Sequence, residues 1–276
     1  MSGTGLDALK GIKALTFDVF GTVVNWRSSV EDALSSALTT KLASSDFQSL
    51  PPGLQLRAET LADTADWAPT FAQQWRNAYS KFTQGFKAGE TAWKDIDAHH
   101  HDSLIELLDK WELSGLFTPA EISELSLVWH RLQPWPDSSE GIGALNALGL
   151  VTATLSNGNT SLLTDLNEYG ALGFQKIISA EDFKAYKPDP KTYLGAADKM
   201  GFDGAAGEVA MVAAHLGDLD AARRNGLRTI YVERQKEEAW ALGDERYVAA
   251  KEWVDLWVGV GEGGFVEVAK RLASVL

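Results

Sequence analysis

Residues 14–22 read ALTFDVFGT, an apolar run that ends at Asp18 and passes into a Gly-Thr turn. Short apolar runs bounded by turn residues are typical of buried strands in parallel sheets. A strand of this kind delivers the side chain at its end to the carboxyl edge of the sheet, where ligands bind in open α/β folds. We therefore expect Asp18 to act as a nucleophile that faces a substrate at that edge.

The second half of the chain alternates short apolar runs with helix-like segments. Four runs predict further strands: residues 150–155, 176–179, 209–214 and 229–232. Three intervening segments have the apolar spacing of helices: residues 160–169, 190–200 and 218–225. Strands that alternate with helices indicate crossover connections and a parallel sheet. The fold class expected for the chain is α/β, with a Rossmann-like parallel sheet as its core.

A long segment between the first two predicted strands has no strand pattern. It contains four stretches with helical apolar spacing: residues 30–42, 67–86, 99–113 and 119–132. Residues 43–53 are rich in Ser and Pro and predict a loop. We expect residues 25–135 to form an all-helical cap domain. The α/β core domain that carries the nucleophile would then comprise residues 1–24 and 136–276.

Composition and charge narrow the classes of partner. The 276 residues carry a net charge of −13 and include no cysteine. The negative charge argues against a nucleic-acid partner, and the lack of cysteine excludes disulfides, thiolate metal sites and a cysteine nucleophile. No run approaches the ~20 apolar residues needed to cross a bilayer, and residues 1–10 lack the apolar centre of a signal peptide. We expect a cytoplasmic protein that binds no nucleic acid and no membrane.

Polar residues follow four of the predicted strands. They are Asp18 and Thr22, Ser156 and Asn157, Lys187 and Tyr193, and His215 and Asp218. Parallel strand ends converge on one crevice, where the ammonium of Lys187 would keep Asp18 ionised. Ser156 and the amides near Asn157, which we expect to open a helix, would receive an anionic group. Asp218 would orient Lys187 or position a water. Each residue alone is compatible with a structural role such as a helix cap, whereas the full set predicts an active site.

In this order the motifs resemble those of the haloacid dehalogenase superfamily. The matching segments are residues 18–22, 155–157, 187–188 and the region around Asp218. The resemblance covers the whole chain and implies a helical cap inserted after the first motif. Most members are phosphatases, in which the residue two places after the nucleophile is an Asp that protonates the leaving alkoxide. Phe20 stands there in this chain and cannot donate a proton, but a halide leaving group scarcely needs one.

The fourth motif also differs from the phosphatase pattern. Phosphatases of the superfamily hold Mg²⁺ with an acidic pair in this motif. Asp218 aligns with the later acid of that pair, and the earlier position then falls in residues 212–214, which read VAA. In the other alignment, Gly217-Asp218 begins the motif. Since a carboxylate that attacks a saturated carbon needs no metal, we expect no metal and no cofactor.

The sequence resembles most closely the type II, L-2-haloacid dehalogenases, whose first motif is Asp-x-Tyr-Gly-Thr. Lys187 and Tyr193 agree with that subfamily, and Phe20 stands where Tyr is usual. The resemblance implies that Asp18 attacks a short 2-haloalkanoic acid and that water hydrolyses the resulting aspartyl ester to a 2-hydroxy acid. The subfamily's halide-binding Arg follows an aromatic residue in a cap helix, which indicates Arg76. The alternative role for Arg76 is a surface ion pair. The resemblance also implies a homodimer.

The fourth motif departs from the subfamily pattern at several positions. Residues 213–218 read AAHLGD where the subfamily often has Ser-Ser-Asn-x-Trp-Asp, so Gly217 replaces a pocket Trp and predicts a larger pocket. His215 either orients water, binds halide or is a structural histidine. The predicted catalytic residues are Asp18, Arg76, Lys187, Asp218 and His215. The predicted substrate-binding residues are Thr22, Phe20, Ser156, Asn157 and Tyr193.

The run of histidines at 99–101 predicts a solvated helix face, because consecutive helical positions do not converge on one metal.

Two other functions remain open from the sequence. One is a Mg²⁺-dependent phosphatase of a small metabolite that works through an aspartyl-phosphate at Asp18. The other is a non-catalytic binding protein that keeps the fold. Phe20 argues against the first, and the joint presence of Asp18, Lys187 and Asp218 argues against the second.

Overall fold

The computed structural model describes residues 5–276, and the chain divides into two compact units. Unit 1 comprises Met1–Asn25 with Gln133–Leu276, and unit 2 comprises Trp26–Leu132. In unit 1 a short antiparallel ribbon, β2 (Val24–Asn25) with β3 (Gln133–Pro134), joins the points where the chain leaves and re-enters. Residues 1–4, part of the stretch expected to lack a signal peptide, lie outside the described residues.

Unit 1 is built on a five-stranded sheet in the order β4-β1-β5-β6-β7. The strands are β1 (Ala14–Phe17), β4 (Val151–Thr154), β5 (Val209–Ala213), β6 (Arg228–Val232) and β7 (Leu256–Val258). Every neighbouring pair is parallel, and Ala14 of β1 lies opposite both Val151 and Val209. All four residues of β1 are buried, as expected for a central strand. The prediction of an α/β fold with a parallel sheet is confirmed.

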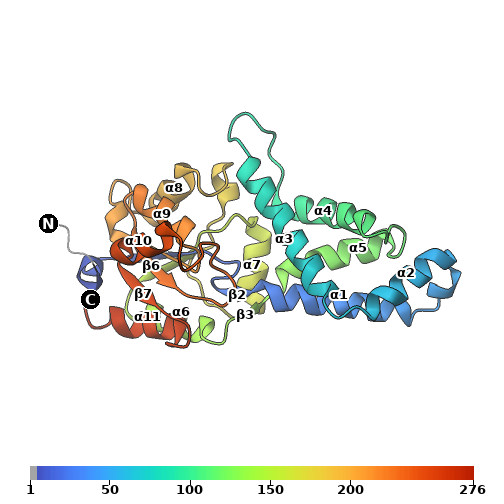
Figure 1. Ribbon diagram of the computed structural model, residues 1–276. Coiled ribbons are helices and arrows are strands. Elements are labelled where there is room, and N and C mark those ends of the chain that lie inside the picture. The colour runs from blue at the N-terminus through green and yellow to red at the C-terminus, as the bar shows by residue number, and fades with distance from the viewer. Residues whose placement is uncertain (1–4) are drawn as a thin grey trace. The chain divides into compact units, whose positions relative to one another are not determined.

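Helices cover both faces of this sheet (Figure 1). They are α6 (Ser138–Ala147), α7 (Thr160–Tyr169), α8 (Pro190–Met200), α9 (Leu216–Arg224), α10 (Glu245–Trp253) and α11 (Gly264–Leu272). Figure 1 shows α6 and α11 on one side of the sheet and α8, α9 and α10 on the other. Gly141 lets α6 approach α11, since a Cβ there would lie 2.3 Å from the Cβ of Phe265. The sheet thus has two apolar faces and leaves its strand ends free for polar residues.

Two features of the sheet differ from the prediction. Residues 176–179 do not form a strand and pair with the sheet only through isolated bridges at Lys176 and Ser179. The reason is that the hydroxyl of Thr154 takes part in the hydrogen bonds there, accepting from Ile178 N at 2.9 Å and donating to Ile178 O at 3.0 Å. Strand β7 was not predicted from the sequence, because it has only three residues.

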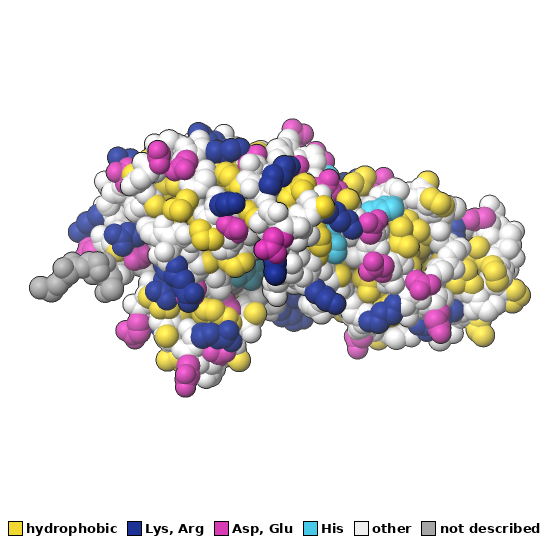
Figure 2. Space-filling model, turned by 90° about the horizontal axis from the view of Figure 1, so that it is seen from above, with side chains coloured by type: hydrophobic (Ala, Val, Ile, Leu, Met, Phe, Trp, Pro, Cys, Tyr) yellow, Lys and Arg dark blue, Asp and Glu magenta, His cyan; other side chains and the backbone are white. Residues whose placement is uncertain are grey.

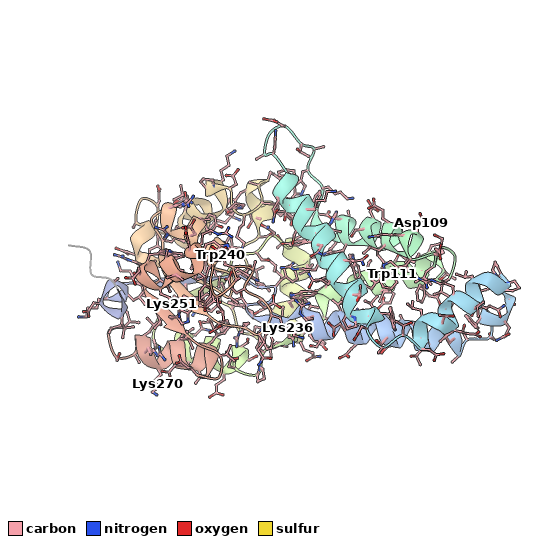
Figure 3. The ribbon with its side chains drawn as sticks, in the orientation of Figure 1. Asp109, Trp111, Lys236, Trp240, Lys251 and Lys270 are labelled. Carbon is pink, nitrogen blue, oxygen red and sulfur yellow. The ribbon has the colours of Figure 1, made fainter. Side chains whose placement is uncertain are left out.

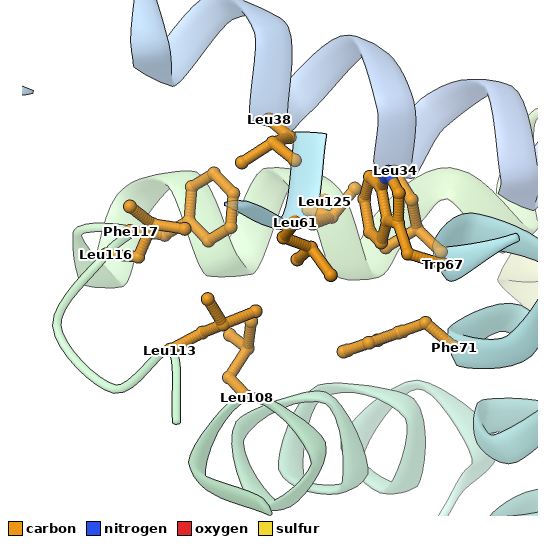
Figure 4. Close-up of a pocket in the computed structure, with 10 residues that line it drawn as sticks. All are labelled: Leu34, Leu38, Leu61, Trp67, Phe71, Leu108, Leu113, Leu116, Phe117 and Leu125. Carbon is orange, nitrogen blue, oxygen red and sulfur yellow. The ribbon is translucent and has the colours of Figure 1, made fainter. Parts of the chain in front are cut away.

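Unit 2 is helical throughout. Its elements are α1 (Trp26–Leu42), a 3₁₀ turn (Phe47–Ser49), α2 (Pro52–Ala62), α3 (Trp67–Gly85), α4 (Ile96–Lys110), α5 (Pro119–Ser126) and a second 3₁₀ turn (Leu127–His130). The predicted loop at 43–53 therefore contains a turn of helix and the start of α2. An apolar pocket within unit 2 is lined by residues from these helices and the loop before α5, namely Leu34, Leu38, Leu61, Trp67, Phe71, Leu108, Leu113, Leu116, Phe117 and Leu125 (Figure 4).

A second part of the unit 2 core is aromatic and contains a histidine. His100 stacks on Trp129 with ring centroids 4.4 Å apart, and Trp75 meets Trp129 edge to face at 5.4 Å. The expected solvated face at 99–101 is therefore wrong. His100 is 1% exposed because it falls on the same face of α4 as the buried Ile96 and Leu104. His99 stacks on Phe82 at 4.2 Å.

The surface carries charged side chains of both signs. Acidic and basic side chains are interspersed over the face seen in Figure 2. Among residues 5–276, we find no helix with the length and apolar character that a bilayer crossing requires.

Candidate active site

The end of β1 places Asp18 at the carboxyl edge of the sheet. Asp18 N donates to Val212 O at 3.0 Å, which extends the strand pairing by one residue. The chain then turns at Gly21, whose φ of +85° is a conformation that glycine adopts without strain. The hydroxyl of Thr22 donates to Asp18 Oδ2 at 2.7 Å and accepts from Ala214 N at 2.9 Å. The turn therefore fixes one oxygen of a carboxylate that is only 8% exposed.

Lys187 joins the two predicted carboxylates. Its Nζ donates to Asp18 Oδ1 at 2.8 Å and to Asp218 Oδ2 at 2.5 Å. Tyr193 donates its hydroxyl to Asp218 Oδ1 at 2.6 Å, and Asn157 Oδ1 accepts from Lys187 N at 2.8 Å. Both oxygens of Asp218 are thus engaged. Asp218 orients the lysine, and Asn157 fixes the backbone that carries it.

The charges of this cluster stabilise one another against burial. Burial alone would raise the pKa of Asp18, but Lys187 and His215 outweigh it and hold that pKa well below its ordinary value. Burial alone would lower the pKa of Lys187, but Asp18 and Asp218 outweigh it and raise that pKa above its ordinary value. Asp18 is therefore an ionised carboxylate at neutral pH, as a nucleophile must be.

The second predicted motif is arranged differently from the expectation. Ser156 and Asn157 do not open a helix, because α7 begins at Thr160 and Asn159 is its N-terminal cap residue. The Ser156 hydroxyl instead accepts from Gly158 N at 3.2 Å within the loop. Phe20 is 2% exposed, and its ring comes within 3.2 Å of the place where a Cβ on Gly158 would lie. Phe20 thus packs the first motif against the second.

A loop of residues 233–244 that was not predicted as part of the site follows β6 and holds Lys236 and Trp240 (Figure 3). Arg234 of this loop donates to Thr22 O at 3.1 Å and pairs with both oxygens of Asp137 at 2.6 and 2.8 Å. The Arg234–Asp137 pair therefore ties the loop to the first motif. The loop has no distinctive spacing relative to the four motifs, so no pattern in the sequence indicated it.

Two acidic residues of the same loop reach the fourth motif. Glu238 accepts from Leu216 N at 2.7 Å, at the start of α9. Glu237 Oε2 lies 3.5 Å from His215 Nε2, and the other ring nitrogen, Nδ1, lies 3.0 Å from Asp18 Oδ2. His215 is therefore placed directly between the predicted nucleophile and a second carboxylate.

The same loop also bears on the pocket expected at Gly217. A ring carbon of Trp240 lies 3.8 Å from the place where a Cβ on Gly217 would stand. An aromatic side chain is therefore present beside this position, supplied by a different segment of the chain.

Arg76 is the one predicted site residue that belongs to unit 2. It lies on α3, with its guanidinium carbon 4.4 Å from the ring centroid of Tyr79 and 5.5 Å from that of Trp26. The other predicted residues all belong to unit 1. Within the described part of the chain, no group of three or more His, Asp, Glu or Cys side chains is arranged to hold a metal ion.

Comparisons with known proteins identify the family of the chain. Residues 12–226 match the family model of haloacid dehalogenase-like hydrolases. The chain is 34% identical over 140 residues to (S)-2-haloacid dehalogenase 1 of Pseudomonas sp. (strain CBS-3), and 34% identical over 113 residues to (S)-2-haloacid dehalogenase 4A of Burkholderia cepacia. These matches cover 49% and 40% of this chain, and only 61% and 48% of the two relatives.

Solved structures match over almost the whole chain. The L-2-haloacid dehalogenase PA0810 is 32% identical, with a TM-score of 0.76, and the match covers 96% of this chain and 100% of that one. The defluorinating L-2-haloacid dehalogenase Rha0230 is 28% identical, with a TM-score of 0.77, over 99% of this chain and 100% of that one. The resemblance drawn from the four motifs is confirmed.

Proposed function

The chain belongs to the haloacid dehalogenase-like hydrolases, and from this membership and the geometry around Asp18 we propose that it hydrolyses short 2-haloalkanoic acids to 2-hydroxy acids. The observation that carries the proposal is the buried Asp18 carboxylate, held ionised by Lys187, with Phe20 where a phosphatase would have its proton donor. The relatives named as 2-haloacid dehalogenases support this substrate class.

In the first half of the reaction, Asp18 attacks the halogen-bearing carbon from the side opposite the halogen. The new bond joins a carboxylate oxygen to that carbon, the carbon–halogen bond breaks, and the halide leaves with the bonding electrons. Configuration at the carbon is therefore inverted. Unit 1 would form the core domain that carries Asp18, and unit 2 would form the cap domain that supplies Arg76 to the departing halide.

Lys187, together with Ser156 and the backbone at Asn157, would bind the carboxylate of the substrate. Lys187 is already held by Asp18 and Asp218, so it needs little reorganisation when an anion arrives. Thr22 and Tyr193 act on this site indirectly, because Thr22 fixes Asp18 and Tyr193 fixes Asp218. In the second half, water hydrolyses the aspartyl ester and releases the 2-hydroxy acid.

A Mg²⁺-dependent phosphatase is the less favoured function. Such an enzyme needs a proton donor two residues after the nucleophile, where this chain has the buried Phe20. It also needs an earlier acid in the fourth motif, where Ala213 and Ala214 are buried apolar residues. The residues present therefore do not fit a phosphatase magnesium site.

The decisive experiment measures halide release from 2-chloropropionate, beside phosphate release from a phosphomonoester panel with and without Mg²⁺. We expect halide release by the wild type and none by Asp18→Asn. The exposed Asp198→Asn, which makes the same change elsewhere in unit 1, should behave like the wild type. Halide release by Asp18→Asn would refute the mechanism. Phosphate release alone would favour the phosphatase, and no turnover on either panel would favour a binding protein.

Two further expectations stay predictions. A homodimer follows from the resemblance, and sedimentation of the purified protein tests it. A cytoplasmic location stays a prediction, and the composition without cysteine fits a reducing compartment.

A further inference from the structure

His215 lies between two carboxylates that come from different parts of unit 1. Asp18, at the end of β1, is 3.0 Å from Nδ1, and Glu237, in the 233–244 loop, is 3.5 Å from Nε2. The side chain of Glu237 is only 4% exposed. Its approach depends on Gly21, because a Cβ at that position would come within 2.1 Å of Glu237 Oε2. The turn that presents the nucleophile therefore also makes room for the second carboxylate.

The charge that surrounds His215 changes during the proposed reaction, because Asp18 is one of its two carboxylate neighbours. Burial alone would lower its pKa, but the hydrogen bonds and charges of Asp18 and Glu237 raise it to about 10. In the free enzyme His215 is thus an imidazolium. When Asp18 becomes an ester it loses its negative charge, and one of the two groups that stabilise the imidazolium is gone. Lys187, which binds the other oxygen of Asp18, then further favours a neutral imidazole.

Asp218, the other candidate for activating water, is already engaged. Its Oδ2 accepts from Lys187 Nζ and its Oδ1 accepts from Tyr193 Oη. With both oxygens already accepting strong hydrogen bonds, Asp218 has little capacity left to accept one from a water. His215 has no such constraint at Nδ1 once Asp18 is esterified. A water that attacks the carboxyl carbon of Asp18 comes within reach of Nδ1, because that nitrogen is 3.0 Å from an oxygen on the same carbon.

We propose that His215 is the base for ester hydrolysis and that Glu237 is its positioning residue, which binds Nε2–H and leaves Nδ1 to face the ester. This inference rests on the proposed function and assigns the second half of that reaction to a pair of residues. The Glu237 carboxylate also stabilises the imidazolium that forms when Nδ1 takes up a proton.

The protons balance over the cycle. After the halide leaves, His215 loses its proton to solvent. Neutral His215 then takes a proton from water as the water oxygen bonds to the Asp18 carboxyl carbon. The bond from that carbon to the substrate oxygen breaks, and His215 gives its proton to the departing alkoxide. The Asp18 carboxyl finally passes its remaining proton to His215, which restores the imidazolium and the carboxylate. The net products are a 2-hydroxy acid, a halide ion and one proton.

The test separates the two halves of the reaction in Glu237→Gln, which keeps the shape of the side chain and removes its charge. With 2-chloropropionate we expect a rapid burst of halide, equal to the amount of enzyme, followed by turnover slowed about 10²-fold. Intact-protein mass spectrometry should show the ester, as a mass gain equal to the substrate less its halide. The control is Glu233→Gln, which makes the same change in the same loop at a residue that contacts Val260 instead. It should behave like the wild type.

The pH dependence of kcat distinguishes the proposed role of Glu237 from a purely structural one, because a structural residue would not shift it. His215 must be neutral in the ester form, so steady-state kcat should fall on the acidic side of the profile. Removing the Glu237 charge makes the imidazole less basic, and the acidic limb of Glu237→Gln should therefore shift to lower pH. His215→Gln should accumulate the ester as well. The size of the halide burst counts the correctly folded active sites in each variant.

The outcomes are distinct. If the wild type releases no halide and forms no ester, the proposed function fails. If the wild type turns over but Glu237→Gln matches Glu233→Gln in rate, ester level and pH profile, only the present inference fails. A Glu237→Gln protein that denatures in urea like the wild type but loses both the burst and the turnover also contradicts it, because Glu237 would then act in the first half of the reaction.

Discussion

Each unit holds one largely buried lysine and one histidine with a shifted pKa, but the two units surround these residues in opposite ways. In unit 1, Lys187 is held between Asp18 and Asp218, whose side chains are 11% and 10% exposed. In unit 2, Lys41 is held between Asp46 and Glu121, whose side chains are 55% and 43% exposed. The lysines have similar partners, yet only in unit 1 are the partners removed from water. Buried carboxylates can serve as nucleophiles, whereas solvated ones at a helix end serve stability.

The histidines show the same contrast. In unit 1 the carboxylates around His215 raise its pKa to about 10. In unit 2 the ring nitrogens of His100 find no hydrogen-bond partner among residues 5–276, and burial among aromatic rings lowers its pKa well below the ordinary value. Unit 1 thus holds a charged histidine for chemistry, and unit 2 holds a neutral histidine as part of its core.

Replacing the two lysines by methionine should produce the largest difference between the units. Lys187→Met leaves two buried carboxylates without their cation, so we expect a loss of about 3–5 kcal/mol in the free energy of unfolding. Halide release should fall by at least about 10³-fold, because Asp18 loses one of the two cations that keep it ionised and the substrate carboxylate loses its cation. Urea denaturation and a halide assay measure the two effects.

Lys41→Met is the matched control for that change. Its two carboxylate partners stay in contact with water, so we expect a loss of about 1 kcal/mol or less and unchanged halide release. Equal destabilisation by the two substitutions would show that the exposure of the carboxylate partners does not determine how much unfolding free energy each lysine contributes.

Arg76 tests whether unit 2 takes part in the chemistry at all. Arg76→Ala should lower halide release by about 10²–10³-fold, since it removes the proposed donor to the leaving halide. The free energy of unfolding should change by only about 1 kcal/mol, because the side chain contributes stacking on Tyr79 and Trp26. The measurements are the same halide assay and urea denaturation.

Arg27→Ala provides the comparison, because the Arg27 guanidinium also stacks on Trp26, at 4.4 Å. It should leave halide release intact. A loss of activity in both variants would indicate that the aromatic cluster of unit 2, and not Arg76 itself, is what the reaction requires.

The strands and helices that could be predicted are those whose pattern is local. Residues 14–17, 160–169 and 190–200 form the expected elements because apolar spacing, proline and turn residues mark their ends. The strand predicted at residues 176–179 does not form, because the side chain of Thr154 competes for the backbone hydrogen bonds. An apolar run in the sequence gives no indication of that competition. The prediction that His100 is solvated was wrong for a similar reason, since the burial of His100 depends on which face of α4 meets the tryptophans.

The predicted site residues of unit 1 do come together, because strand order brings their strand ends to one edge. Asp18, Lys187, Asp218 and His215 could be proposed from their positions after strands. Glu237 could not, because its contact with His215 is made by a loop whose path depends on Arg234, Asp137 and Gly21. Contacts of this kind arise from tertiary packing and have no periodic signature in the sequence.

The finest test of the comparison is the pH dependence of stability, where the two histidines should act with opposite sign. The folded-state pKa of His215 lies above the unfolded value of 6.5, so its contribution is complete below pH 6.5 and is lost as the pH rises toward about 10. The folded-state pKa of His100 lies below 6.5, so its contribution is complete above that pH and is lost as the pH falls.

Urea denaturation across pH 5 to 10 measures both effects in the wild type, in His215→Gln and in His100→Phe. Between pH 7 and 10 the wild type should lose stability more steeply than His215→Gln, by up to about 1.4 kcal/mol per pH unit. Between pH 6.5 and 5 it should lose stability more steeply than His100→Phe, which puts a ring of similar size among the same aromatic side chains. Parallel curves on the alkaline side would mean that Asp18 and Glu237 do not hold a proton on His215. Parallel curves on the acidic side would mean that the core of unit 2 tolerates a charged histidine, and the two histidines would then not differ in the charge that their surroundings favour.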